Sequence, residues 1–409
     1  MLASTGRHGV ELRTPLIDFD NHYYEPDDCC SRHIESKFRD RAVRCVRHAD
    51  GHGEWFFGDR PLRYHPFARD DVLRPGDLRA VYAGLPAGSW QITPSDDPVW
   101  RDPGARLRAM DDQGVHATVV LPTFGVAFEP ELAEDVEADY ANMRSFNRWV
   151  EETWGFARDG RIFAPPYLPL LDVELAIAEL DSLLARGARL VLLRPGPAAF
   201  GRSPADPVYD PIWARLQEAG VPAVFHVSLT PYFDALGALW GEDVEHMRGE
   251  GTVSPFLFFV GHGARPIADT IASLITRGLF DRFPALEVIS LENGVGWAKD
   301  IFKLDRMYKT KGRPRAGEEH VRLGRVGGVD LTRMPGEVMR TNVFLAPFHE
   351  ERFRDIVDLV GAGQVLYGSD WPHPEDTVAP RAMLDDLDEL TADEVDLIVH
   401  TTPRRLLQL

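Results

Sequence analysis

Residues 162–226 read IFAPPYLPLLDVELAIAELDSLLARGARLVLLRPGPAAFGRSPADPVYDPIWARLQEAGVPAVFH. Three apolar runs of strand length lie in this stretch, at 162–168, 190–193 and 223–226. The residues between them have helical spacing: Val173–Arg186 is a predicted helix that ends before Gly187, and Pro211–Ala219 is one that ends before Gly220. Because strands that alternate strictly with helices pair in parallel, this stretch predicts an α/β fold with a parallel sheet.

The same alternation extends over the rest of the chain. Eight strands are predicted, beginning at Leu16, Ala117, Ile162, Leu190, Ala223, Leu286, Asn342 and Val365. Eight strand–helix units favour a closed (β/α)8 TIM barrel over an open sheet, and a decorated barrel of this kind reaches 409 residues as one domain. We therefore predict a single domain over residues 1–409. Residues 27–98 are predicted to form an irregular insertion or cap after strand one.

Composition narrows the class of protein. The net charge of −19 disfavours nucleic acid and anionic lipid surfaces as partners, which leaves a small-molecule substrate. Three cysteines, at positions 29, 30 and 45, do not suggest a disulfide framework and fit a reducing cytoplasm. The sequence shows no secretory leader and no run near the about 20 apolar residues of a membrane span. We expect a cytoplasmic protein that does not associate with membranes.

Polar residues with metal-binding chemistry follow the predicted strands. Asp20 and His22 end strand one, His226 ends strand five, Glu292 follows strand six, and Asp370 follows strand eight. Since barrel active sites lie at the carboxyl ends of the strands, these side chains are expected on one rim.

Each of these residues also has a structural interpretation. Asp20 can cap a turn, a histidine such as His22 or His226 is often a satisfied surface or core residue, and Asp370 can form an Asx-turn. However, Asp20 and His22 are two residues apart on a strand and so point to the same face. Imidazole and carboxylate together suit zinc, manganese or iron. Their coincidence with His226 and Asp370 at strand ends favours a metal site. Asp370 can both bind the metal and move a proton.

Five segments resemble a known family. They read IDFDNHYYEP at 17–26, RLRAMDDQGV at 106–115, YDPIWARLQEAGVPAVFH at 209–226, FDRFPALEVISLENG at 280–294 and LYGSDWPHP at 366–374. With these segments the chain resembles the amidohydrolase-related group that includes aminocarboxymuconate-semialdehyde decarboxylase, γ-resorcylate decarboxylase and related metal-dependent hydrolases. The resemblance runs from about residue 16 to 405.

The resemblance implies one divalent metal ion on Asp20, His22, His226 and Asp370. Zinc is the expected ion, with manganese and iron as alternatives. Two positions depart from the family pattern: many members have histidine where Asp20 stands, and the decarboxylases have a catalytic histidine where this chain has Glu292. Glu292 can therefore act as the acid or base, extend the metal shell, or hold a water molecule beside it.

Three further residues are predicted to contact the substrate. Arg194 ends strand four, where a lysine would be needed for a carbamylated two-metal centre, and its guanidinium suits a substrate carboxylate. The alternative for Arg194 is a salt bridge at the rim. His262 and His373 are predicted to line the pocket, and a loop histidine without a role is the alternative for each.

These features predict a metal-dependent enzyme with Asp370 and Glu292 as catalytic residues. Hydrolysis of a small cyclic or aromatic, carboxylate-bearing substrate is placed first because the strand-six histidine is missing. Non-oxidative decarboxylation of a small aromatic or unsaturated acid is the alternative reaction. A barrel that only binds a ligand is the third hypothesis. By resemblance, we expect a homodimer or a higher homo-oligomer.

Overall fold

The computed structural model describes residues 10–49, 52–62, 68–69, 71–86, 88–243, 254–311, 331–375 and 377–409. Parallel strands follow one another around its core. They are β1 (Leu16–Tyr23), β8 (Val115–Pro122), β9 (Ile162–Phe163), β10 (Val191–Leu193), β11 (Ala223–His226), β12 (Val288–Leu291) and β13 (Val343–Leu345). Nearly all residues of these strands are buried, as expected for a parallel sheet that is covered by helices on its outer face.

Two irregular segments close these strands into a ring. β1, β8 and β9 pair in that order, and so do β10, β11, β12 and β13. Tyr167 bridges to Leu192 and links the first group to β10, while Val365 bridges to Leu345 at the edge of β13. The carbonyl of Tyr367 then accepts a 2.7 Å hydrogen bond from the amide of Phe19 on β1. The sheet thus returns to its first strand, which confirms the predicted barrel.

The third and eighth predicted strands are shorter than expected. A strand was predicted over residues 162–168, but β9 ends at Phe163 because Pro165 and Pro166 have no amide hydrogen to donate to a ladder. Residues 365–367 make only isolated backbone bonds to their two neighbours and form no regular strand. Both segments still occupy their places in the ring.

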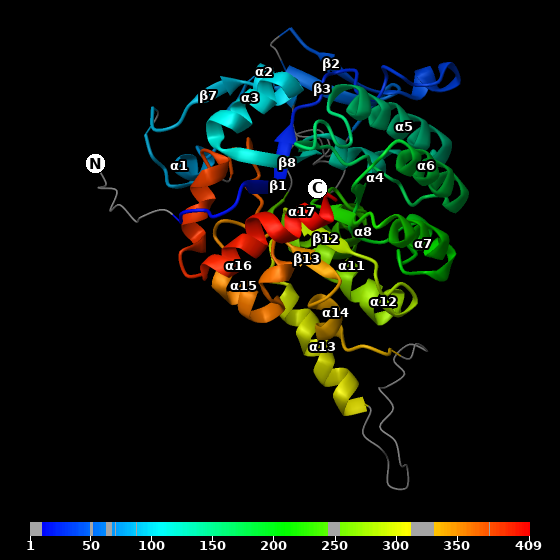
Figure 1. Ribbon diagram of the computed structural model, residues 1–409. Coiled ribbons are helices and arrows are strands. Elements are labelled where there is room, and N and C mark those ends of the chain that lie inside the picture. The colour runs from blue at the N-terminus through cyan, green and yellow to red at the C-terminus, as the bar shows by residue number, and fades with distance from the viewer. Residues whose placement is uncertain are drawn as a thin grey trace.

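Helices cover the barrel, as Figure 1 shows. The main ones are α3 (Pro103–Gln113), α5 (Val136–Thr153), α6 (Val173–Ala185), α7 (Asp210–Ala219), α8 (Tyr232–Trp240), α10 (Pro255–Gly261), α11 (Ala264–Thr276), α13 (Ala298–Lys311), α14 (Pro335–Met339) and α15 (Phe353–Val360). The apolar stripe predicted for α6 is the face that it buries, with Leu180 and Leu183 fully covered. Each fully buried leucine contributes roughly 1.5–3 kcal/mol of transfer free energy.

The described residues of the insertion after β1 form short strands, so the expectation of an irregular segment was wrong. β2 (Val43–Arg47), β3 (His52–Phe57) and β4 (Arg60–Pro61) form an antiparallel sheet that β5 (Ala68–Arg69) joins, and β6 (Asp71–Leu73) pairs with β7 (Ile92–Pro94). Phe38 and Ala42 pack on Ala138 and Ala141 of α5. The insertion lies beside α5 at the top of Figure 1.

The end of the chain returns to its beginning. A capping box begins α16 (Ala392–Asp396), where the Thr391 hydroxyl and the Glu394 carboxylate each accept from the other residue's backbone amide. α17 (Thr402–Leu406) contacts β1, as the red and blue segments in Figure 1 show.

Within the described part of the chain, no helix has both the length and the apolar character needed to cross a membrane.

Candidate metal centre

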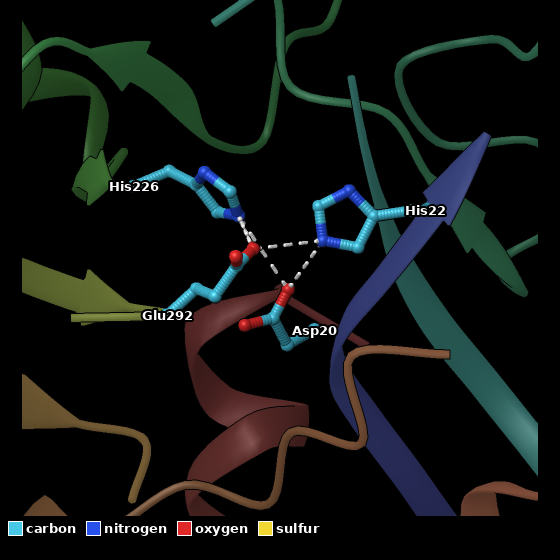
Figure 2. Close-up of side chains that lie close together, drawn as sticks. All are labelled: Asp20, His22, His226 and Glu292. Carbon is cyan, nitrogen blue, oxygen red and sulfur yellow. Dashed lines mark ion pairs between the residues drawn. The ribbon is translucent and has the colours of Figure 1, made fainter. Parts of the chain in front are cut away.

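Four side chains from three barrel strands point toward one another (Figure 2). Asp20 and His22 lie two residues apart on β1, His226 is the last residue of β11, and Glu292 directly follows β12. All four therefore lie on the carboxyl rim of the barrel, as the sequence predicts for Asp20, His22 and His226.

Their ligand atoms surround one point. His22 Nε2 lies 3.3 Å from Asp20 Oδ1 and 3.3 Å from Glu292 Oε2. His226 Nε2 lies 3.0 Å from Glu292 Oε2 and 3.8 Å from Asp20 Oδ1. Ligand atoms that share one ion through bonds of about 2.0–2.2 Å lie roughly 3.0–3.5 Å apart, so this spacing fits a small divalent cation.

The hydrogen bonding of these atoms also fits a cation. Asp20 Oδ1, His22 Nε2, His226 Nε2 and Glu292 Oε2 are buried, and none makes a hydrogen bond of ordinary geometry. Buried polar atoms without a partner are rare in native proteins, and here four of them converge. These residues can hold a metal ion, and a divalent cation satisfies all four atoms together.

The electrostatics of the centre favour positive charge. Burial alone lowers the pKa of His226, but the carboxylates of Glu292 and Asp20 raise it to about 9. Burial likewise opposes protonation of His22, yet Asp20, Asp370 and Glu292 raise its pKa well above the ordinary value. Burial raises the pKa of Glu292, but the two histidines bring it well below its usual range. The excess of carboxylates that holds protons on the histidines can equally hold a divalent ion.

The tautomer of His226 is suited to metal binding. Its Nδ1–H donates a 2.8 Å hydrogen bond to the carbonyl of Val227, which leaves the lone pair of Nε2 directed at the centre. A backbone carbonyl that orients a histidine ligand in this way is a common feature of metal sites.

Asp370 lies on the edge of the same cluster. Its Oδ1 is 3.0 Å from His22 Nε2 and 2.8 Å from His373 Nδ1. His22, Glu292, Asp370 and His373 form a second group with ligand atoms close enough to hold an ion. Burial and the charge of His22 lower the pKa of His373, but Asp370 and Glu375 together outweigh them and the pKa is raised. Asp370 is thus shared between the predicted metal position and a proton-holding histidine.

Both predicted catalytic carboxylates have a strained backbone. Glu292 has φ 50° and Asp370 has φ 52°, in the left-handed region that side chains other than glycine rarely adopt. Such conformations cost about 1–3 kcal/mol each and concentrate at functional sites. Glu292 directly follows β12, and Asp370 follows the irregular segment 365–367; at both positions the strained backbone turns the side chain into the centre.

The three predicted substrate residues have different surroundings. His373 stacks on the ring of His22, with centroids 3.9 Å apart, and so lies in the site. His262 stacks on Phe258 with centroids 4.6 Å apart. Burial lowers the pKa of His262, and Glu292 and His226 act on it electrostatically, so it lies within range of the centre. Their contact with a substrate stays a prediction.

Arg194 is already paired. Its Nη2 and Nε donate to Glu129 Oε1 at 3.1 and 3.2 Å, and its remaining bonds go to the carbonyls of Pro195 and Pro197. Tyr167 donates to the other oxygen of Glu129 at 2.8 Å. The structure thus shows the salt bridge that was the alternative for Arg194, and its role as a carboxylate anchor stays a prediction.

Two residues of the site were missed in the sequence. Thr123 Oγ1 donates to the carbonyl of Tyr23 at 2.8 Å and lies 3.1 Å from His373 Nε2. Glu129 neutralises Arg194. Thr123 directly follows the barrel strand β8, and this position could have identified it from the sequence. Nothing local to Glu129, which lies on the short helix α4 (Phe128–Leu132), indicated its partner.

Known proteins match this chain by family model, by sequence and by structure. A family model described as Amidohydrolase matches residues 17–409. A γ-resorcylate decarboxylase from Polaromonas sp. (strain JS666) is 24% identical over 279 residues, which cover 65% of this chain and 76% of that protein. The crystal structure of an amidohydrolase from Mycobacterium avium subsp. paratuberculosis K-10 is 34% identical, covers 97% of this chain and 100% of its own, and superposes with a TM-score of 0.84.

One of the more distant structures contains a metal. It is a dihydroxybenzoic acid decarboxylase from Polaromonas sp. JS666 with bound manganese and an inhibitor, 2-nitroresorcinol. It is 16% identical, covers 97% of each chain and has a TM-score of 0.58. At this identity the likeness concerns the fold.

Proposed function

The chain belongs to the amidohydrolase family and is a metal-dependent hydrolase or carboxy-lyase; of these two, we propose the carboxy-lyase. Its substrate on this proposal is a small aromatic acid that bears a hydroxyl group beside the carboxylate. The sequence alone placed hydrolysis first, and the relatives reverse that order, since those with a stated reaction among them are decarboxylases of phenolic acids.

The observation that carries the proposal is the buried Asp370–His373 pair, at 2.8 Å, beside the metal ligands of a chain related to a γ-resorcylate decarboxylase. Loss of CO2 from an aromatic acid requires a proton at the ring carbon, and this pair can hold one at His373 Nδ1 or Asp370 Oδ1. When bound, a divalent cation supplies a Lewis acid for substrate oxygens and lowers the pKa of a neighbouring water.

The reaction balances without an oxidant or a reductant. The bond between the ring carbon and the carboxyl carbon breaks, its electron pair stays on the ring carbon, and CO2 leaves. The ring carbon takes the proton that the Asp370–His373 pair holds, and solvent later restores it. In this scheme Glu292 would hold the ion together with His22 and His226, whose Nε2 atoms lie 3.3 and 3.0 Å from its Oε2.

Hydrolysis stays a second candidate because of Glu292. The resemblance places a catalytic histidine at this position in the decarboxylases, and a carboxylate there is suited to accept a proton from an attacking water. Glu292 Oε2 lies 3.0 Å from His226 Nε2, so this carboxylate is close to the point where an ion would activate the water.

The two reactions are separated by their products. The metal-loaded protein is incubated with mono- and dihydroxybenzoic acids, and the released CO2 is trapped and the phenol quantified; a parallel panel of lactones and cyclic amides is followed by pH-stat. We expect CO2 and phenol in equal amounts, lost in Asp370→Asn. Turnover of the second panel alone would favour the hydrolase, and metal binding without turnover of either would favour a ligand-binding barrel.

We propose manganese or zinc as the ion. Carboxylates suit manganese and imidazoles suit zinc, and the centre offers both. Three decarboxylase structures of this fold have bound manganese, which adds support for that ion. Elemental analysis of protein purified without added metal, followed by reconstitution with each ion, decides between them.

We propose further that the protein is a homo-oligomer that joins through α8 and α10. Four large apolar side chains on these helices are exposed: Leu239 by 76%, Trp240 by 69%, Phe258 by 56% and Phe259 by 77%. Because an aromatic side chain buries about 150–250 Å² at an interface, this patch offers much of the roughly 800 Å² that each partner buries in a stable dimer. A second copy, with the same patch, covers it symmetrically.

Light scattering after gel filtration tests this assembly. We expect wild type to elute as an oligomer and Phe259→Glu to shift it toward the monomer. Val378→Glu, at an apolar residue 64% exposed elsewhere on the surface, serves as the control and leaves the assembly unchanged. A monomeric wild type at micromolar concentration would contradict the proposal.

A further inference from the structure

The metal centre joins the two ends of the barrel sequence. Asp20 and His22 come from the first strand, whereas Asp370 follows the last segment of the ring. The two backbones are held together by Asp370 N to Asp20 O at 2.9 Å and by His22 N to Trp371 O at 2.8 Å. The geometry of the centre therefore depends on what fixes these two segments side by side.

Gly368 allows the close approach of these segments. A Cβ atom at this position would lie 2.7 Å from Asp20 Cβ, which is too short for any pair of side-chain carbons. Gly368 is not among the residues with positive φ, so a left-handed backbone is not the reason for a glycine here. Its role is to let the backbone that follows residues 365–367, the eighth segment of the barrel, lie directly against Asp20.

Asp18 bonds to both segments at once. It is fully buried, and its Oδ1 accepts from Ser369 N at 3.0 Å while its Oδ2 accepts from Ser369 Oγ at 2.6 Å. On its own strand, the same carboxylate accepts from Asn21 Nδ2 at 2.9 Å and from Asp20 N at 3.3 Å. Asp18 thus holds the residue before Asp370, the backbone of Asp20, and Asn21, which lies between Asp20 and His22.

A buried arginine completes the network. Arg106 has no exposed surface, and its guanidinium donates to Asn21 Oδ1, to the carbonyl of His22, and to the carbonyl of Val99 at 2.8 Å. It also lies over the ring of Trp371 at 4.8 Å. Asp18 acts favourably on the charge of Arg106, while burial still raises the pKa of Asp18 to about 7 despite its hydrogen bonds from Ser369.

We propose that Asp18 is a positioning residue of the metal centre, which sets the distance between the β1 ligands Asp20 and His22 and the Asp370 carboxylate through its bonds to Ser369 and Asn21. The proposal rests on the metal ligands proposed above and is independent of which reaction the enzyme catalyses. Groups that orient metal ligands typically change metal affinity about 10–100-fold when they are removed.

Two variants weaken this network to different degrees. Asp18→Asn keeps the volume of the side chain but replaces one acceptor oxygen by an NH2 group, which then faces a donor from Ser369 or from Asn21. Ser369→Ala removes only the hydroxyl and leaves the backbone amide bond at 3.0 Å. Asp139→Asn is the matched control, because Asp139 is an equally buried carboxylate on α5, outside the network.

The experiment measures metal affinity in the full-length protein. Each variant is stripped of metal and titrated with Mn2+ and Zn2+ by equilibrium dialysis, and the visible spectrum of the Co2+ form reports the ligand geometry. The melting temperature of the metal-free form is measured in parallel. We expect affinity about 10–100-fold weaker in Asp18→Asn with a shifted Co2+ spectrum, a change of a few-fold in Ser369→Ala, and none in Asp139→Asn.

The following results would overturn the proposal. If Asp18→Asn lowers the melting temperature of the metal-free protein but binds metal as wild type does, Asp18 has a structural role only. If Asp18→Asn does not fold, unchanged affinity and an unchanged Co2+ spectrum in Ser369→Ala likewise assign Asp18 a structural role only. Failure of wild type to bind any metal overturns the metal centre itself and this proposal with it, whereas absence of CO2 release affects only the proposed reaction.

Discussion

At the scale of single residues, the centre depends on two carboxylates, Glu292 and Asp370, whose backbone has a strained conformation. Glu292 and Asp370 both have positive φ and both directly follow the barrel core, so the fold must offset their strain elsewhere. Glu292 was expected in one of three roles. Its Oε2 atom, 3.0 Å from His226 Nε2 and 3.3 Å from His22 Nε2, has the position of a metal ligand.

Glu292→Gln tests that position. The amide keeps the shape but removes the negative charge that faces His22 and His226, so we expect metal affinity to fall by at least about 100-fold, at the upper end of the effect of groups outside the ligand shell. Equilibrium dialysis with elemental analysis measures it. Glu350→Gln, at an exposed carboxylate on the same rim, is the control and should bind as wild type does. An unchanged affinity with lost turnover would instead make Glu292 the acid or base.

The raised pKa of His226 predicts how the stability of the metal-free protein depends on pH. Its pKa is about 9 in the folded protein and 6.5 as a reference value for the unfolded chain, because Glu292 and Asp20 outweigh the opposing effect of burial. The folded state therefore binds the proton more tightly. This contribution is fully present below pH 6.5 and is lost as the pH rises toward 9.

Urea unfolding at pH 6.5, 7.5 and 9 measures this slope. We expect the free energy of unfolding of the metal-free protein to fall over this range, and the fall to be smaller in His226→Gln. Metal competes with the protons for the histidines, so metal affinity should rise over the same range. A metal-free protein whose stability is flat or rises between pH 6.5 and 9 would contradict the assigned electrostatics.

At the scale of elements, short connections between barrel units set the environment of the site. α4 brings Glu129 to the end of β10, where it pairs with Arg194; the side chains are only 3% and 6% exposed. Removing one partner of such a buried pair is costly because the other charge stays buried without compensation. A substrate carboxylate can use Arg194 only in competition with Glu129.

Arg194→Met separates the two roles. If the arginine is structural, the variant loses about 3–5 kcal/mol of unfolding free energy, and Glu129→Gln combined with Arg194→Met recovers part of it. Chemical denaturation measures both variants. If Arg194 is a substrate anchor, stability changes little and KM rises for carboxylate substrates. We expect the first result.

At the scale of the whole molecule, the barrel is closed by segments far apart in the sequence. The last helices lie on β1, and residues 365–371 complete the ring and the metal centre together (Figure 1). An ion held by Asp370 as well as by Asp20 and His22 would link the first and last parts of the barrel, and its binding energy would add to the stability of the folded state.

Removal of the metal should lower the melting temperature of the whole chain. At a free metal concentration 100 times the Kd, binding contributes about 2.7 kcal/mol, so calorimetry with and without EDTA should show a clear difference. His22→Ala, which lacks a ligand, is the control: its melting temperature should not respond to EDTA. Equal melting temperatures of wild type in both conditions would contradict an ion that bridges the two ends.

The sequence by itself determined the order of the barrel units and the placement of Asp20, His22, His226 and Asp370 after strands. Helical and strand periodicity, caps and strand-end polar residues are local, so they can be found without knowing what packs against them.

The tertiary structure decided which of these side chains meet. Glu292 lies among the ligand atoms, Glu129 neutralises Arg194 from 65 residues away, and Asp18 holds Ser369 from 351 residues away. The antiparallel sheet in the insertion was likewise missed. Such pairings follow from how the ring closes and how strands find their neighbours, which depends on the packing of the whole chain and leaves no periodic signal near either partner.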